Sequence, residues 1–121
     1  MQLYTTYRDK RFMEEWISIF RWSWKDFDDY WENYGWDNNP NANASFSCVS
    51  ALLEGVGVLV KRNLIDPALV NDLLWIVIRN YWMKFRPIIM GMRVKLNDPE
   101  IFKWIEYLYN EISPLALAGK P

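Results

Sequence analysis

A stripe of indole and guanidinium groups is the pattern in this chain that is best suited to recognition. Trp75, Arg79, Trp82 and Arg86 recur at spacings of four, three and four residues, which puts them on one side of a helix. A guanidinium plane stacks on an indole, and each such contact contributes about 0.5 to 2 kcal/mol depending on its exposure. The stripe therefore predicts a contact surface for an anionic partner.

The alternative is that this stripe packs inside the molecule against a short acidic helix that comes earlier in the chain. The opposite charges are already present, and an exposed indole is costly to leave bare. The carboxylates of that helix are Asp26, Asp28, Asp29 and Glu32.

Glu54 is a second candidate, because it is the one carboxylate in a long apolar run between Phe46 and Arg62. A buried carboxyl with a raised pKa would suit general-acid chemistry. The interpretation that we favour is an internal polar anchor, bonded to an indole, a tyrosine hydroxyl or a basic side chain. If an aromatic-lined pocket surrounds Glu54, we expect it to be lined by Trp31, Tyr34 and Tyr81.

Gly55 and Gly57 superficially resemble a nucleotide-binding loop. No strand precedes them, a third glycine is missing and no Gly-Lys-Ser/Thr follows, so the phosphate-binding interpretation fails. We expect these glycines to allow the close approach of a neighbouring helix.

Composition excludes several chemistries. The 121 residues contain no histidine and one cysteine, Cys48, so Cys/His zinc sites and histidine-based nucleophile systems are impossible within one chain. The sequence predicts no enzyme, no catalytic residue, no cofactor and no metal site. A single cysteine fits a reducing, cytoplasmic setting.

Charge and hydropathy limit the classes of partner that this chain is expected to bind. The 14 basic and 15 acidic residues nearly balance, which argues against nucleic-acid binding. The longest uninterrupted apolar runs, residues 56–60 and 73–78, fall short of the about 20 residues of a membrane span, so none is expected. Aromatic residues make up 17% of the chain, more than one small core can hold, which favours aromatic edges or interfaces.

Apolar spacing predicts five helices. The first covers residues 12–20, a short second one follows the capping residues Ser23 and Asp26 to end at Gly35, and residues 37–41 form a turn before a third helix.

Aspartate-proline pairs open the last two helices, at Asp66-Pro67 and Asp98-Pro99. The fourth helix runs toward Lys95 with a kink or break at Pro87, and Pro114 stops the fifth. The expected core face of the fourth helix is Leu69, Val70, Leu73, Leu74, Ile76, Val77, Tyr81 and Phe85.

The predicted architecture is all-α: an antiparallel bundle of four longer helices plus one short aromatic-acidic helix. One domain covers residues 1–121, with a core of about 7–112 and a flexible tail at 113–121.

Four segments in combination carry a family resemblance. They are WKDFDDYW at 24–31 with Tyr34-Gly35, LEGVGVLVKR at 53–62, LID at 64–66 and EYLYNE at 106–111. Together they resemble a family of small prokaryotic, often archaeal, all-helical proteins of unknown function. The resemblance implies a membrane-spanning segment ahead of the helical domain in many members, which this chain is expected to lack, and it implies no activity, cofactor or catalytic residue.

The function predicted from these observations is a protein-interaction or scaffold module that self-associates as a homodimer through aromatic surface around Trp22, Trp36, Trp75 or Trp82. The alternative is a small-molecule-binding helical domain with its pocket near Glu54.

Overall fold

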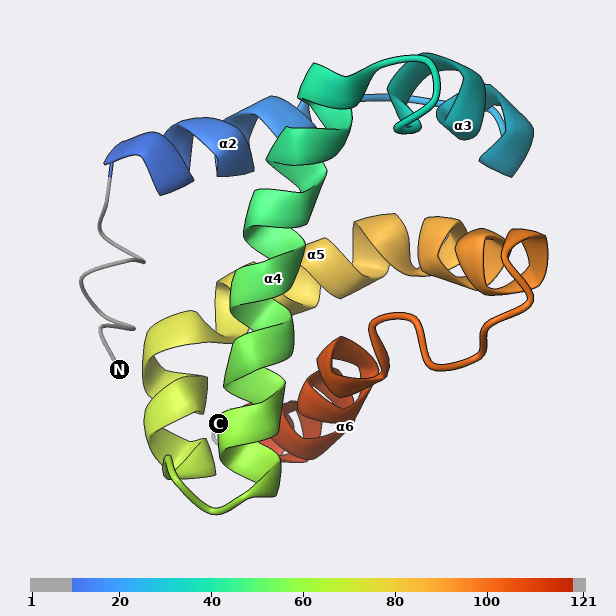
Figure 1. Ribbon diagram of the computed structural model, residues 1–121. Coiled ribbons are helices and arrows are strands. Elements are labelled where there is room, and N and C mark those ends of the chain that lie inside the picture. Colours follow the sequence, from blue (N-terminus) through green and yellow to red (C-terminus); the bar gives the residue numbers. More distant parts are fainter. Residues whose placement is uncertain (1–9, 119–121) are drawn as a thin grey trace. The chain divides into compact units, whose positions relative to one another are not determined.

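Every regular element in the part of the chain that the structure describes, residues 10–118, is a helix (Figure 1). The computed structural model contains α2 (Lys10–Phe20), α3 (Phe27–Tyr34), α4 (Pro40–Lys61), α5 (Pro67–Lys95) and α6 (Lys103–Ala118). The all-α fold class is thereby confirmed. The chain divides into two compact units, Met1–Ala51 and Leu52–Pro121, and an antiparallel four-helix bundle is not established. The ends of the predicted domain, residues 1–9 and 119–121, lie outside the described residues.

Aromatic packing organises the first unit around Tyr30, whose side chain is fully buried. The Tyr30 ring meets the rings of Trp24 and Phe46 edge-on, with centroids 5.0 and 6.2 Å apart, and Trp22 stacks on Tyr34 at 4.3 Å. Burial raises the pKa of the Tyr30 hydroxyl. These contacts place several of the many aromatic side chains of the sequence in and around the core of the first unit.

The start of α3 agrees with the predicted cap. The Asp26 carboxylate accepts a hydrogen bond from the backbone N–H of Asp29 at 2.9 Å, and the helix ends at Tyr34, before Gly35. Asp26 and Asp29 thus serve local backbone structure, because Asp29 in turn accepts from the N–H of Lys25 at 2.9 Å. Asp28 and Glu32 are exposed.

The start of α4 corrects the prediction of a turn at residues 37–41. The helix begins at Pro40, and the Asn39 side-chain oxygen accepts a hydrogen bond from the N–H of Ala42 at 3.1 Å. Asn39 and Pro40 therefore act as cap and first helical residue, the same chemistry that correctly predicted Asp66 and Pro67 at the start of α5.

Two prolines lie inside helices: Pro87, where we expected a kink or a break, and Pro114, where we expected the helix to end. α5 passes Pro87 without a break, and α6 continues through Pro114 to Ala118, so residues 113–118 are not a tail. Each proline removes the hydrogen bond to the carbonyl four residues earlier, on Met83 and Asn110. Both of these residues are exposed, so water can satisfy the two carbonyls.

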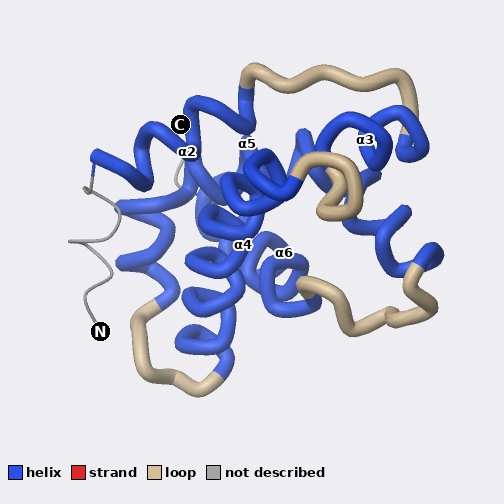
Figure 2. Tube along the Cα trace, turned by 45° about the horizontal axis from the view of Figure 1, so that its top comes forward, coloured by secondary structure: helices blue, strands red, loops and turns tan. Residues whose placement is uncertain are grey.

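α6 starts later than predicted. The Asp98 carboxylate accepts from the N–H of Glu100 at 2.9 Å, but the turn ends at Phe102, whose φ is 52°, and the helix begins only at Lys103. Figure 2 shows the resulting loop between α5 and α6 in tan.

The second unit joins the last part of α4 to α5 and α6, and α5 lies along α6. Its fully buried core consists of Leu53, Val56, Ile78, Tyr81, Phe85, Ile88, Ile89, Ile105, Leu108 and Ile112. By length and composition alone, α4 could cross a membrane, a criterion that the core helix of a soluble protein also meets.

Candidate interaction surface

α5 has two apolar faces, and only one of them is covered. The covered face carries Val70, Leu74, Val77, Ile78, Tyr81, Trp82, Phe85, Ile88, Ile89 and Met92, all buried. Their spacing of three and four residues keeps them on one side of the helix, toward the core of the unit.

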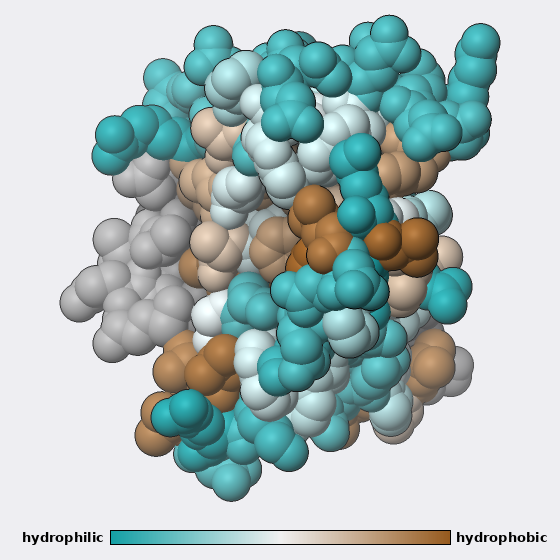
Figure 3. All heavy atoms as spheres, turned by 45° about the vertical axis from the view of Figure 1, so that its right-hand side comes forward, coloured by the Kyte–Doolittle hydropathy of each residue, from teal (hydrophilic) through white to brown (hydrophobic). Residues whose placement is uncertain are grey.

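The second apolar face consists of Leu69, Leu73, Ile76 and Met83, which are 47%, 40%, 62% and 63% exposed. We call these four residues the α5 face. The prediction that Leu69, Leu73 and Ile76 belong to the core is therefore wrong. Figure 3 shows one side of the molecule, where apolar side chains reach the surface among polar ones.

Charged residues border the α5 face along one edge. Asp72, Arg79 and Arg86 follow one another at intervals of seven residues, and all three are exposed. The Arg79 guanidinium donates a hydrogen bond to the side-chain oxygen of Asn80 at 3.1 Å. Among the described residues, no ion pair involves Asp72, Arg79 or Arg86. Their charges are open to a partner.

The predicted stripe divides into two parts. Trp75 and Trp82 both stack on Tyr109 of α6, with ring centroids 5.9 Å apart in each pair. Trp82 is only 5% exposed and Trp75 is half-buried. The indoles thus pack α5 against α6, and the exposed guanidiniums of Arg79 and Arg86 remain at the border of the α5 face.

Glu54 is tied to the backbone of α6. Its Oε1 accepts a hydrogen bond from the N–H of Ile105 at 2.9 Å, and the Trp104 N–H also bonds to the carboxylate. Both amides lie in the first turn of α6, which Phe102 precedes without a polar side chain to cap it. Burial raises the pKa of the Glu54 carboxyl, against the lowering effect of these bonds and of the charges of Lys103 and Arg93. The predicted polar anchor has backbone amides as its partners in place of the side chains that we expected.

The two glycines of α4, Gly55 and Gly57, differ in how closely other atoms approach them. A Cβ on Gly57 would overlap the carbonyl of Trp104, so Gly57 lets α4 and α6 approach closely, as predicted. A Cβ on Gly55 would meet no atom within 4 Å, so the same prediction is wrong for Gly55.

Arg93 holds the loop that precedes α6. Its Nε donates to the carbonyl of Ile101 at 2.9 Å, and its NH1 pairs with the Glu106 carboxylate at 2.8 Å. The side chain is largely buried, which makes these charge-assisted bonds stronger than surface ones. Arg93 therefore belongs to the framework of the unit, unlike Arg79 and Arg86.

The residues of the predicted pocket are divided between the units. Trp31 and Tyr34 belong to the first unit, where Trp31 meets Trp36 edge-on at 4.5 Å. Glu54 and Tyr81 belong to the second, and Tyr81 is fully buried beside Phe85.

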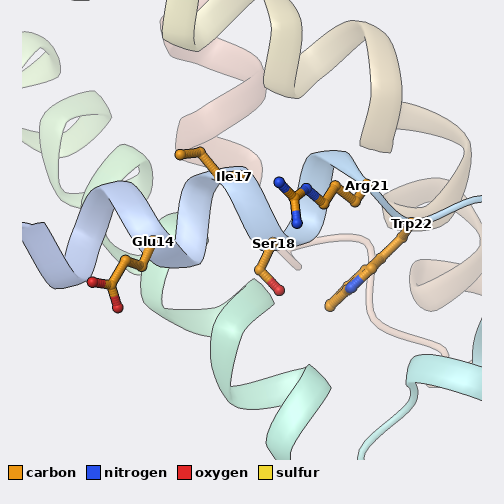
Figure 4. Close-up of a pocket in the computed structure, with 5 residues that line it drawn as sticks. All are labelled: Glu14, Ile17, Ser18, Arg21 and Trp22. Carbon is orange, nitrogen blue, oxygen red and sulfur yellow. The ribbon is translucent and has the colours of Figure 1, made fainter.

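The first unit carries an open hollow of about 420 Å³, shown in Figure 4. Side chains of α2 and of the residues just after it line this hollow: Glu14, Ile17, Ser18, Arg21 and Trp22. None of the predicted pocket residues is among them.

The α5 face was not predicted as an exposed surface, although its residue spacing is present in the sequence. Leu69, Leu73, Ile76, Asn80 and Met83 alternate at four and three residues, the spacing of a coiled-coil seam. This seam lies beside the buried apolar residues that begin with Val70 and Leu74, so spacing alone predicts one broad core face that contains both sets. A helix with more apolar positions than one core can cover indicates an additional contact surface.

Comparisons with known proteins give a family and no activity. No curated protein and no solved structure matches this chain. A family model described as "Domain of unknown function (DUF4760)" matches residues 1–112, nearly the whole length. The chain therefore belongs to this family of uncharacterised domains, as its motifs had suggested for a family of unknown function.

Proposed function

We propose that this domain is a protein-interaction module, without catalytic activity, whose contact surface is the α5 face. The occupant is an amphipathic helix of a protein partner. Such a helix would lay its apolar stripe along Leu69, Leu73, Ile76 and Met83.

One observation carries this proposal: four large apolar side chains stand exposed at helical spacing on a helix whose opposite face is already buried. Single exposed apolar residues are ordinary on protein surfaces, but a row of them marks a contact. Their three- and four-residue spacing is the one at which anchors recognise a second helix, and the row follows α5 across the bend that Figure 1 shows in the first half of this helix.

The charges at the border specify the partner further. Arg79 and Arg86 are exposed and without ion pairs among the described residues, and they flank the apolar row on one edge. A partner helix with a carboxylate on the facing edge would pair with them, which adds specificity and speeds association.

Binding of a synthetic helix tests the proposal. The probe is a fluorescent peptide of about 20 residues with leucines at heptad a and d positions and glutamates on its flanks. We expect its fluorescence anisotropy to rise with protein concentration, and Ile76→Asp to weaken the binding at least about tenfold, because a carboxylate would enter the apolar contact.

Three controls sharpen this test. Val94→Asp introduces the same charge at an 82% exposed valine of α5, 18 residues from Ile76, and should bind like the unaltered protein. A peptide with lysine flanks should bind more weakly because it would face Arg79 and Arg86. Equal binding by the Ile76→Asp protein, or binding of anionic lipid vesicles with no binding of the peptide, would overturn the proposal.

A further inference from the structure

We infer that Met83 is a modification site, at which a peroxide oxidises the thioether to the sulfoxide and thereby weakens the binding of a partner helix to the α5 face. This inference rests on the proposed function and names a way in which the same surface is regulated. The evidence for it is the exposure of Met83, its place in the apolar row and the hydroxyl group beside its sulfur atom.

Met83 is the most accessible methionine among residues 10–118. It is 63% exposed, against 36% for Met13 and 3% for Met92, and Met90 is half-buried. Access of the oxidant to the sulfur decides which thioether reacts first, because burial keeps a peroxide in solution away from it. We therefore expect Met83 to be oxidised ahead of the other methionines in this range.

The reaction adds one oxygen atom to the sulfur of Met83. The sulfur attacks one oxygen of hydrogen peroxide, the O–O bond breaks, an S–O bond forms, and the second oxygen leaves as water. The sulfur loses two electrons and the peroxide gains them. The product is a polar sulfoxide in place of a flexible apolar side chain, and methionine sulfoxide reductases reverse the change with electrons from thiols.

The position of Met83 in the α5 face gives this change its effect on binding. The other members of the face, Leu69, Leu73 and Ile76, have hydrocarbon side chains that a peroxide does not oxidise. A sulfoxide at Met83 would have to leave water in order to lie against the apolar stripe of a partner, and the loss of its hydrogen bonds to water costs free energy. Oxidation of one residue therefore opposes docking along the whole row.

The Tyr109 hydroxyl lies beside the sulfur of Met83. It donates a hydrogen bond to the Met83 Sδ at 4.0 Å, and the Tyr109 ring is held in place by stacking against Trp75 and Trp82. A thioether is a weak acceptor, whereas a sulfoxide oxygen carries a larger negative charge and accepts a stronger hydrogen bond. The hydroxyl would thus hold the oxidised side chain against α6, where it is not available to the partner.

Peroxide treatment followed by peptide binding tests the inference. All proteins carry Cys48→Ser, because a peroxide would also oxidise the exposed thiol of Cys48. The probe is the fluorescent peptide with glutamate flanks, made without methionine or cysteine. Tandem mass spectrometry should find the first added oxygen on Met83, and fluorescence anisotropy should show binding weakened at least about tenfold. Incubation with the two stereospecific methionine sulfoxide reductases and dithiothreitol should restore the affinity.

Three variants assign the effect to Met83. Met83→Leu should bind the peptide like the unaltered protein and keep its affinity after peroxide treatment. Met83→Gln should bind as weakly as the oxidised protein, because its amide is also polar. Met13→Leu is the matched control, since it removes an exposed methionine that is not part of the α5 face, and it should leave the effect of peroxide unchanged. Circular dichroism must show unaltered helicity after oxidation, because unfolding as the cause of weaker binding would overturn the inference.

Tyr109→Phe tests the part of the hydroxyl. Oxidation should raise the midpoint of thermal unfolding by a few degrees in the protein that retains Tyr109, because the new hydrogen bond joins α5 to α6. The midpoint of Tyr109→Phe should not rise on oxidation. Equal shifts in the two proteins would show that Tyr109 does not bind the sulfoxide and would overturn this part of the inference.

The results distinguish the inference from the proposed function. If the reduced protein binds the peptide and oxidation of Met83 leaves the affinity unchanged, the modification site is wrong and the interaction surface stands. The same conclusion follows if Met13 is oxidised before Met83, or if Met83→Leu loses as much affinity after peroxide as the unaltered protein. If the reduced protein does not bind the peptide at all, both proposals are overturned.

Discussion

The Glu54 carboxylate of α4 accepts a hydrogen bond from the backbone N–H of Ile105, 51 residues later in the chain, at 2.9 Å. It thereby caps α6, because Phe102, the residue that precedes this helix, has no polar side chain that could do so. A side chain of one helix thus completes the hydrogen bonding of another, and the two elements are held at a fixed distance from each other.

Removing this cap should destabilise the domain. We predict that Glu54→Ala lowers the free energy of unfolding by about 1 kcal/mol, the usual effect of losing a capping side chain. Glu54→Gln should retain most of the stability, because its amide oxygen can still accept the hydrogen bond from Ile105. Urea denaturation followed by circular dichroism measures both variants, and equal losses for Ala and Gln would show that the bond does not hold α6.

Glu54 also predicts how stability depends on pH. Its pKa is raised in the folded state, mainly by burial, so the folded state binds the proton more tightly than the unfolded chain does. The contribution is present in full below the unfolded pKa near 4.5 and is lost as pH rises through the folded pKa. The stability of Glu54→Gln relative to the unaltered protein should therefore increase from pH 4 to pH 8, and a constant difference would contradict this prediction.

The two glycines of α4 should respond to alanine in opposite directions. Gly57→Ala puts a methyl group into the carbonyl of Trp104 and should cost about 1 to 3 kcal/mol, because α4 and α6 must move apart. Gly55→Ala meets open space and should stabilise the helix by about 0.5 to 1 kcal/mol. Thermal unfolding compares this matched pair, and a loss of stability at both positions would refute the distinction.

Arg93 should not tolerate replacement by lysine. An ammonium group cannot serve both the Ile101 carbonyl and the Glu106 carboxylate, so Arg93→Lys should lower the free energy of unfolding by about 2 kcal/mol. Arg86→Lys makes the same change at an exposed position and should stay within about 0.5 kcal/mol of the unaltered protein. Similar effects in guanidinium denaturation would show that the Arg93 bonds contribute little.

Periodicity and capping residues were sufficient to predict the helices, but not all of their ends. Asp66 and Pro67 at the start of α5 and Asp26 before α3 act through neighbouring backbone groups, so their effect can be predicted locally. A capping side chain followed by proline also opens α4, at Asn39 and Pro40, where we had predicted a turn. Pro114 misled the prediction because a helix can keep a proline where the freed carbonyl lies on an exposed residue such as Asn110.

The partners of site residues could not be predicted in the same way. Nothing near Glu54 in the sequence points to the amide of Ile105, since tertiary packing alone brings the two together. The division of α5 into a buried and an exposed apolar face also depends on where α6 lies, because Tyr109 covers Trp75 and Trp82. Without that contact, spacing alone made the indoles look exposed and the leucines buried.

Hydroxyl-radical footprinting with mass spectrometry tests most directly that the α5 face is a covered interface. Oxidation of Ile76 and Met83 should decrease several-fold when the acidic peptide is added, whereas oxidation of Val94, which is exposed and is not part of the α5 face, should stay constant. Oxidation of Ile76 and Met83 that is independent of the peptide concentration would contradict the account.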